Sequence, residues 1–502
     1  MNFTPVLLTT DVLLWLLVFA IAGYAWYVRR HEHLLVPWLK VRQSRVAMVC
    51  ITVLTFYVGI GLADSLHFRA DSGAPGRTQA GVEVRSLLDV LLGATLGPMA
   101  GKSEKTYSAP LATHSFAKET VQLPGGGQAR EFPRLVVGGA HLKNPADSGA
   151  DIAWRGTLGL LEGVGLFVLL NGLLALWVAR QGGGPLQACK TMWRDTAPAP
   201  WRPILVTLLL ICLLVAVAVS LGSHYHLLGT DKVGKDVLTI SLQSIRTGLV
   251  IGTLTTMVML PFAVLLGLAA GYFRGWVDEL IVYLYTSLSS IPSVLLIAAA
   301  VLIVQVGIDN HQEFFPTTLQ RADMRLLALC VILGLTGWTG LCRLLRGEAL
   351  KLRELDYIQA AQAFGVARLR ILTRHMLPNV MHLVTITAVT DFSGMVLAEA
   401  VLSYVGVGVD PTTNSFGGMI NAARLEMSRD PMVWWLLVSA FFFMLGLVLA
   451  ANLFADAVQE AFDPRRVVRR ARPRLFQPGP MGGPVEAAEP MENPRAPGGR
   501  PA

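Results

Sequence analysis

Charged residues are scarce in this sequence. Asp, Glu, Lys and Arg together make up 15% of its 502 residues, and 53% of the residues are hydrophobic. Because soluble domains carry roughly 25% charged residues, this composition excludes an ordinary soluble protein and indicates an integral membrane protein. Lys and Arg outnumber Asp and Glu by 42 to 34. In a membrane protein this excess is expected in cytoplasmic loops and tails, so it does not indicate a nucleic-acid partner.

Residues typical of metal sites and catalysis are also few. The five cysteines show no metal-ligand spacing, and none lies between positions 64 and 155, so neither a metal site nor a disulfide framework is predicted. His224 and His226 have no further Cys or His nearby, which favours ordinary loop residues. The chain has no HExxH, no GxSxG and no paired aspartates at helical spacing within an apolar segment. We therefore expect no catalytic residues and no cofactor bound by this chain.

A nucleotide-binding loop is missing as well. The segment from Gly97 to Ser103 looks similar to one, but three residues separate Gly97 from Gly101 where a P-loop needs four. No hydrophobic strand leads directly into the segment. The sequence therefore predicts no nucleotide site in this chain.

Long apolar runs, by contrast, are abundant. Each is close to the roughly 20 residues that a helix needs to cross a bilayer, so we expect an all-α polytopic membrane protein. The nine expected spans lie at about 12–28, 46–63, 157–178, 204–221, 249–272, 280–304, 326–345, 380–405 and 434–454. Basic residues gather in alternate loops, which predicts an outer N-terminus and a cytoplasmic C-terminus. The N-terminus lacks a basic segment and a clear cleavage site, so the first span is expected to be uncleaved.

Composition divides the chain into regions. Residues 1–63 hold the first two spans, and residues 64–155 form a polar, Gly- and Pro-rich insert on the outer side. The insert is either a small folded module or a partly disordered loop. Residues 156–203 contain the third span and a cytoplasmic linker, and residues 204–466 contain the other six spans. The tail at 467–502 is expected to be disordered.

One cytoplasmic loop, residues 346–379, has a distinctive pattern. Tyr357, Ala361 and Phe364 recur at helical spacing and predict a small apolar knob on a short helix at about 354–364. Because the loop lies between two apolar spans, the membrane protein presents this helix to water.

The residues after the knob predict how this short helix is attached. Gly365 is expected to end it as a C′ glycine, and a basic run beginning at Arg368 follows. Pro378 marks the first turn of the next membrane span, where proline is tolerated. A short helix with an apolar knob and a hinge glycine, joined rigidly to a membrane span, suits a lever that a soluble partner can push.

This stretch resembles the EAA loop of ABC importer permeases, whose pattern is E-A-A, three residues, G, nine residues, then I-x-L-P. The corresponding residues here are Gln359, Ala360, Ala361, Gly365 and Pro378. The chain departs from the pattern at Gln359, which replaces the glutamate, and at His375, which replaces the isoleucine. The wider segment 346–379 is similar to the dipeptide/oligopeptide branch.

The resemblance continues from position 204 to the end of the last span. Residues 289–292, Ser-Ser-Ile-Pro, are expected to break the span at 280–304 and resemble the family's SIPxxLL segment. The region around Glu399 resembles its EAxLSFLGLG segment. Candidates for the translocation path are therefore Ser289, Ser290, Pro292, Asp391 and Glu399. Glu399 should face protein or water, because exposing a carboxylate to lipid costs a few kcal/mol.

The resemblance implies a six-helix permease core in a bacterial inner membrane, here preceded by three extra membrane helices and a periplasmic insert. It implies import of dipeptides, oligopeptides or related small solutes, with a homologous second permease, two ABC ATPase subunits that bind ATP and Mg²⁺, a periplasmic solute-binding protein and membrane lipid as partners. It also implies that the chain is not itself an enzyme. Residues expected to couple to the ATPases are Tyr357, Gln359, Ala360, Ala361, Phe364, Gly365, Arg368 and Pro378.

An ion-coupled secondary transporter is the alternative function. It would use Glu162, Asp391 and Glu399 as ion-coupling carboxylates and would not need the loop at 346–379. Transport on an ion gradient without ATPases would favour it.

Overall fold

Helices dominate the computed structural model, which describes residues 3–70, 84–97, 101–122, 128–180, 184–194, 200–315 and 317–462. Within these ranges, nine helical segments are long and apolar enough to cross a membrane. They are Thr9–Arg29 (α1), Arg45–Asp64 (α3), Pro145–Ala179 (α5 with a preceding turn), Trp201–Gly222 (α7), Val237–Phe273 (α8), Ser293–Asn310 (α10), Thr318–Arg353 (α11 and α12), Arg368–Val405 (α14 to α15) and Trp435–Phe462 (α17). The predicted fold class is confirmed. The tail expected at 467–502 lies outside the described residues.

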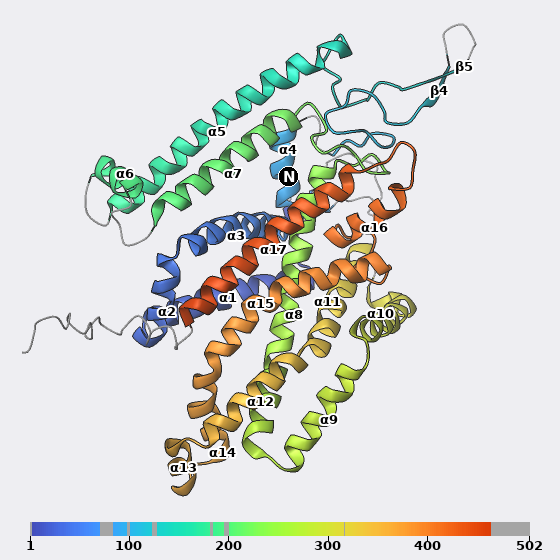
Figure 1. Ribbon diagram of the computed structural model, residues 1–502. Coiled ribbons are helices and arrows are strands. Elements are labelled where there is room, and N and C mark those ends of the chain that lie inside the picture. The colour runs from blue at the N-terminus through green and yellow to red at the C-terminus, as the bar shows by residue number, and fades with distance from the viewer. Residues whose placement is uncertain are drawn as a thin grey trace, which may run out of the picture. The chain divides into compact units, whose positions relative to one another are not determined.

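The shorter elements lie between these membrane segments (Figure 1). The short helices are α2 (Glu32–Gln43), α4 (Leu87–Leu96), α6 (Pro185–Arg194), α9 (Trp276–Ser290), α13 (Asp356–Ala363), α14 (Arg368–Ile371) and α16 (Phe416–Glu426). Strands β1 (Phe3–Val6), β2 (His67–Ala70) and β3 (Val84–Ser86) form an antiparallel sheet in that order, and β4 (Glu119–Gln122) pairs with β5 (Gln128–Glu131). The insert therefore shares its sheet with the N-terminal segment.

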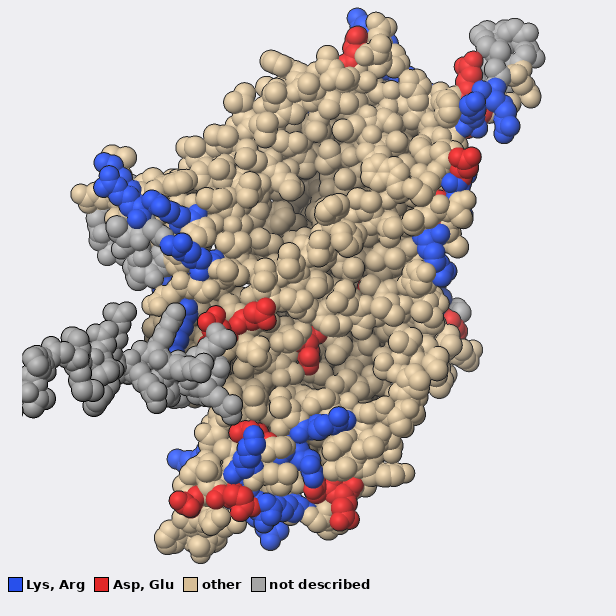
Figure 2. Space-filling model, in the orientation of Figure 1, with Lys and Arg blue, Asp and Glu red and all other residues tan. Residues whose placement is uncertain are grey.

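The span expected at 280–304 is two helices. Helix α9 ends at Ser290, and α10 begins at Ser293. Pro292 lacks a backbone N–H and cannot continue the hydrogen-bond ladder, which explains the break. Figure 2 shows a broad uncharged surface between charged ends, with a concentration of charges at the end formed by α12 to α14, as expected for a membrane protein.

Helix α8 is the centre of the packing. It is largely buried, and α3, α11, α12, α15 and α17 all pack on it. Small residues allow the close approach: a Cβ on Gly267 would lie 2.8 Å from Leu345, and one on Gly271 would lie 2.4 Å from Ala349. Lipid gives no hydrophobic drive between helices, so such backbone contacts supply much of the association energy. They join α8 firmly to α12, which leads into the loop at 346–379.

The N-terminal helices are packed into the core. Helix α3 contacts α7, α8 and α17, and a Cβ on its Gly61 would lie 2.5 Å from Leu249 of α8. Helix α5 packs along α7 through Gly159 and Gly163, whose added Cβ atoms would meet the α7 backbone at 2.8 and 2.9 Å. This Gly-x-x-x-Gly pair therefore serves close helix packing.

A buried polar cluster fixes the start of α1. Arg246 of α8 donates two hydrogen bonds to Asp11 Oδ1, at 2.9 Å from Nε and 2.6 Å from Nη2. Asp323 of α11 accepts a hydrogen bond from the backbone N–H of Thr9 at 2.8 Å and another from the Thr10 hydroxyl. Asp11, Arg246 and Asp323 are all less than 9% exposed. The first turn of α1 thus connects the N-terminal parts of two core helices, α8 and α11.

The insert is attached to the core through Trp435, the first residue of α17. This side chain is 1% exposed, and its ring centroid lies 4.8 Å from that of Phe116 and 6.5 Å from that of Tyr107. Its indole Nε1 donates to the carbonyl of Thr230 at 3.0 Å. The Thr230 hydroxyl in turn accepts from the Ser108 N–H of the insert at 2.6 Å. Aromatic packing and hydrogen bonds together hold this part of the insert on the end of the core where α17 begins.

A buried ion-pair chain strengthens the attachment. His226 lies between Asp236, with Nδ1 3.2 Å from Oδ1, and Glu104 of the insert, with Nε2 3.6 Å from Oε1. Burial alone would lower the pKa of His226, but the hydrogen bond to Asp236 and the negative charges of Asp236 and Glu104 outweigh it and raise the pKa to about 9. Burial would raise the pKa of Glu104, but nearby His226 and hydrogen bonds from three backbone N–H groups lower it to about 2. No local pattern in the sequence indicates this role for His226, because its partner Glu104 is distant along the chain.

We expect the attachment of the insert to weaken between pH 6.5 and 9. Protonated His226 stabilises the folded state fully below its unfolded pKa of about 6.5, and this contribution disappears as the pH rises through the folded value of about 9. The loss would be of the order of 3 kcal/mol. Thermal unfolding of wild type and His226→Gln across this range measures it, with the exposed His114→Gln as control. An equal pH dependence in all three proteins would contradict the assignment.

Candidate coupling site

Helix α13 presents two aromatic side chains to solvent. Tyr357 is 46% exposed and Phe364 is 87% exposed. Ile358 on the opposite side is fully buried and packs in a cluster with Ile371. Ala361 is half-buried against the same cluster, so the structure places it between the exposed knob and the core. Ile358 was not among the predicted site residues, although its position three residues before Ala361 is the helical spacing that could have indicated an anchor.

Gly365 ends α13 in a Schellman motif. The N–H of Val366 donates to the carbonyl of Ala361 at 3.1 Å, and the N–H of Gly365 donates to that of Gln362 at 3.0 Å. The φ angle of Gly365 is +73°, in the left-handed region that favours glycine. Val366 packs against the core cluster beside Ala361. The chain therefore turns sharply here while remaining tied to the helix.

Gln359 makes a hydrogen bond that a glutamate could not make. Its Nε2 donates to the carbonyl of Glu354, just after the end of α12, at 3.2 Å. An ionised carboxylate has no hydrogen-bond donor. The Gln359 amide therefore links α12 to α13, whereas the glutamate of the family motif would repel the Glu354 carbonyl. Ala360, next to Gln359, is exposed.

The far side of the loop holds Tyr357 in place. Asn379 of α15 (Leu377–Val405) donates from Nδ2 to the Tyr357 hydroxyl at 2.9 Å and to the carbonyl of His375 at 2.7 Å. Pro378 lies in the first turn of α15, as expected. A π-helical turn, Leu372–Met376, joins α14 to α15. Helix α13 is thus tied directly to the membrane helix that follows it.

Ion pairs stabilise the rest of the end of the molecule that carries α13. Arg346 of α12 binds both carboxylate oxygens of Asp278 of α9, at 2.5 and 2.7 Å. Arg274 pairs with Glu354 at 2.5 Å. These contacts connect the ends of α8, α9 and α12, so a force on α13 acts on several membrane helices together.

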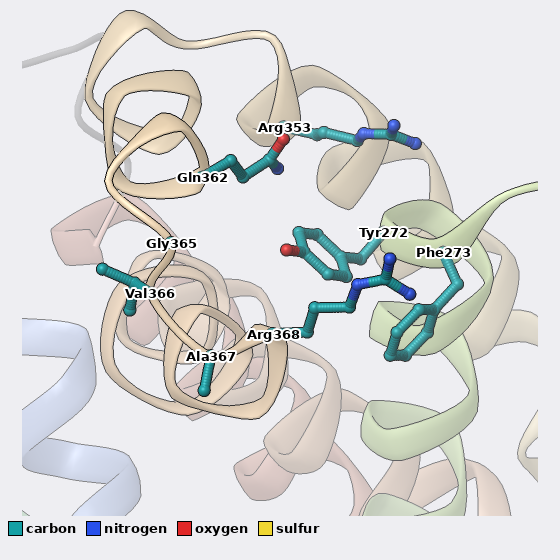
Figure 3. Close-up of a pocket in the computed structure, with 8 residues that line it drawn as sticks. All are labelled: Tyr272, Phe273, Arg353, Gln362, Gly365, Val366, Ala367 and Arg368. Carbon is teal, nitrogen blue, oxygen red and sulfur yellow. The ribbon is translucent and has the colours of Figure 1, made fainter.

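A recess of about 430 Å³ opens behind α13. Its walls come from the end of α8, the last residue of α12, and the segment from α13 to α14 (Figure 3). Arg368, one of the predicted coupling residues, lines it together with Arg353, Gln362 and Tyr272. The recess lies next to the hinge at Gly365, so it shares the surface on which the knob is exposed.

The candidate translocation residues do not form one cluster. Ser289 and Ser290 are exposed beside the break before Pro292, on α9. Asp391 is half-buried within α15. Glu399 is 2% exposed, accepts a hydrogen bond from the Ser403 hydroxyl at 2.6 Å, and would lie 2.7 Å from a Cβ placed on Gly417 of α16. Of the two roles left open for Glu399, the structure places it at a helix-packing contact.

Comparison with known proteins identifies the architecture. Residues 263–468 match the model of the family described as binding-protein-dependent transport system inner membrane component. The oligopeptide transport system permease protein OppC of Mycobacterium tuberculosis is 32% identical over 246 residues, which are 49% of this chain and 78% of that protein. The chain belongs to this permease family.

Other relatives agree with this assignment. The glutathione transport system permease protein GsiD of Pectobacterium atrosepticum is 30% identical over 48% of this permease and 74% of the relative. The dipeptide transport system permease protein DppC of Bacillus subtilis is 27% identical over 48% and 69%. The permease is therefore a multi-pass inner-membrane component of a binding-protein-dependent transport system, and its relatives match about half of its length.

The coupling site falls within the family match, whereas the N-terminal helices do not. Residues 346–379 lie inside the matched range 263–468, and α1, α3 and α5 lie before it. The contacts of α3 with α8 and of α1 with α11 show that these additional helices are packed on the permease core.

Proposed function

We propose that this permease forms half of the translocation path of an ATP-driven importer for dipeptides, oligopeptides or related small solutes. The names of the relatives, which refer to oligopeptide, dipeptide and glutathione transport, support this class of solute. The observation that carries the coupling role is α13 itself. Tyr357 and Phe364 are exposed on a helix that is bonded to both neighbouring membrane segments.

The proposed mechanism is mechanical. Two ATPase subunits bind ATP and Mg²⁺, and each holds the short helix of one permease in a surface cleft. Closure of the ATPases moves α13, and the bonds from Gln359 and Asn379 transmit this movement to α12 and α15. Rigid helices convert the movement into opening of the path toward the outside. Free energy comes from differential binding of the two ATPase states, and this chain supplies no covalent chemistry.

The orientation follows from the same proposal. With α13 in the cytoplasm, an odd number of spans places the N-terminus in the periplasm and the C-terminus in the cytoplasm. A solute-binding protein would deliver its cargo at the outer end, where the insert is attached around Trp435. In this position the insert can contact the binding protein or brace the homologous second permease.

The ion-coupled alternative has weaker support. A coupling carboxylate has to exchange ions with a water-filled path, yet Glu399 is enclosed against α16 and hydrogen-bonded to Ser403. Asp391 lies two helical turns away along α15, at roughly 12 Å for about 1.5 Å per residue. The two carboxylates therefore do not form a shared ion site.

Reconstituted transport tests the proposal. Proteoliposomes containing this permease, its second permease and the ATPases should accumulate a labelled peptide only when ATP and a loaded binding protein are supplied. A proton or sodium gradient without ATP should give no accumulation. Gradient-driven uptake by liposomes that lack the ATPases would overturn the proposal in favour of a secondary transporter.

A further inference from the structure

The recess behind α13 is lined by hydrogen-bond donors from four helices. Arg353 comes from the end of α12, Arg368 from the start of α14, and Tyr272 from the end of α8 (Figure 3). Gln362 of α13 completes the polar lining. Among the residues that the structure describes, no carboxylate lines the recess, so its charged groups there are all cationic.

These two arginines differ from their paired neighbours. Arg274, Arg346 and Lys351 form ion pairs with Glu354, Asp278 and Glu348, respectively. Across the described ranges, neither the Arg353 nor the Arg368 side chain has a hydrogen bond or an ion pair, and the Arg353 Nη1 atom is buried without a partner. A buried charged donor without an acceptor is costly. The Arg353 Nη1 donor therefore lacks an acceptor in the isolated chain, and an anion in the recess would supply one.

The shape of the donors indicates which anion fits. A guanidinium presents a planar fork of N–H donors that matches a carboxylate in a bidentate geometry. A tyrosine hydroxyl and a glutamine amide can donate to the same group. At about 430 Å³, the recess is large enough for an acidic side chain together with part of the loop that carries it.

The position of the recess favours a protein occupant over a lipid. From position 345, where the expected span ends, α12 continues for eight residues to Arg353, which is about 12 Å at about 1.5 Å per residue. The headgroup layer adds only about 5–7 Å to each side of the hydrocarbon core. We therefore expect the recess to lie beyond the headgroups. It is beside Gly365 and one residue from the 87% exposed Phe364.

We propose that the recess receives an aspartate or glutamate side chain from the ATPase subunit that docks on α13, with Arg353 and Arg368 as its binding residues. This inference rests on the proposed function. It also gives a physical role to Gln359: the motif's own acid is absent here, so the permease contributes the cations at this contact and the partner contributes the carboxylate.

The test uses the assembled transporter, purified through a tag on the second permease, and measures ATPase retained per permease at low and high salt. Arg353→Glu and Arg368→Glu should each reduce retention about tenfold, since a lost charge pair of about 1.4 kcal/mol corresponds to that factor. Arg370→Glu, an exposed neighbour that does not line the recess, should retain ATPase within about twofold of wild type. Reversing one acidic residue on the ATPase to arginine should restore binding to the Arg368→Glu permease.

Separate outcomes distinguish this inference from the function on which it rests. Phe364→Ala tests docking of α13 alone. If Phe364→Ala loses ATPase while Arg353→Glu and Arg368→Glu retain it, the docking surface stands and the recess proposal is overturned. Phosphatidylglycerol vesicles test for a lipid occupant. If the arginine variants keep their ATPase and lose only the stabilisation of the permease that these vesicles give, a lipid phosphate is the occupant and the proposal is likewise overturned. Because Arg368 is exposed, its variant keeps the test valid even if Arg353→Glu fails to fold.

Discussion

Replacing Gly365 with aspartate should reduce ATP-driven uptake at least tenfold while the permease still inserts at its normal level. The φ angle of +73° costs an L-residue roughly 1–2 kcal/mol, which is about a tenfold change in an equilibrium. A Cβ at this position meets nothing within 4 Å. The effect therefore comes from strain at the turn and from a new negative charge at the partner surface. That charge also lies beside the cationic recess and would compete for Arg368.

The same substitution at a second glycine distinguishes the effect of backbone strain from the loss of coupling. Gly275 also has a positive φ of +60° and open space at its Cβ position, but it lies in the turn between α8 and α9. Gly275→Asp introduces the same side chain and, because Gly275 has ψ −140°, a backbone strain at least as large, without touching α13, so uptake should fall by less than about twofold. Uptake in vesicles, normalised to inserted protein, is the measurement. Equal losses in both variants would show that strain alone explains the effect and would remove the case for a coupling hinge.

Replacing Arg246 with methionine should destabilise the folded permease by about 3–5 kcal/mol, the usual cost of leaving a buried charge without its partner. Arg246 supplies two hydrogen bonds to Asp11, and both residues are less than 9% exposed. The remaining contact of Asp11, with His67 Nδ1 at 2.9 Å, cannot replace a guanidinium that is always charged. Thermal unfolding in detergent and the yield of folded protein both report this loss.

Two further variants make the result specific. The double replacement Asp11→Leu and Arg246→Met removes both charges and should recover most of the lost stability, because an apolar pair of similar volume can substitute for a buried ion pair. Arg274→Met breaks the exposed pair with Glu354, which is worth less than about 1 kcal/mol. A double variant no more stable than Arg246→Met would refute the ion pair as the reason for the loss.

The hinge at Gly365 could be predicted from the sequence, whereas the buried ion pair could not. The hinge at Gly365 is local: helical spacing before it, a basic run after it and Pro378 beyond it are read within one stretch of chain. The pair of Asp11 with Arg246 joins residues 235 positions apart. Nothing in the sequence connects an aspartate near the first span with an arginine in the fifth.

Features that depend on local chemistry could be predicted from the sequence alone. Apolar runs of sufficient length predict the membrane segments, because a backbone in lipid must satisfy its own hydrogen bonds as a helix. The proline at 292 accounts for the break between α9 and α10, since it has no N–H to donate. The resemblance to the permease family also lies in short, contiguous motifs, which is why the amino-acid sequence was enough to indicate the family.

Which helices meet, and what the polar residues between them do, follows from the tertiary structure. It places Glu399 against α16, buries Ile358 beneath the exposed knob, and brings Arg353 and Arg368 to one recess with Tyr272. It also adds a strand from residues 3–6 to the insert's sheet and makes His226 an ion-pair partner of Glu104. The physical reason is common to all of these: hydrophobic periodicity gives each helix a buried face, but partner choice depends on shape and charge complementarity between segments far apart in the chain.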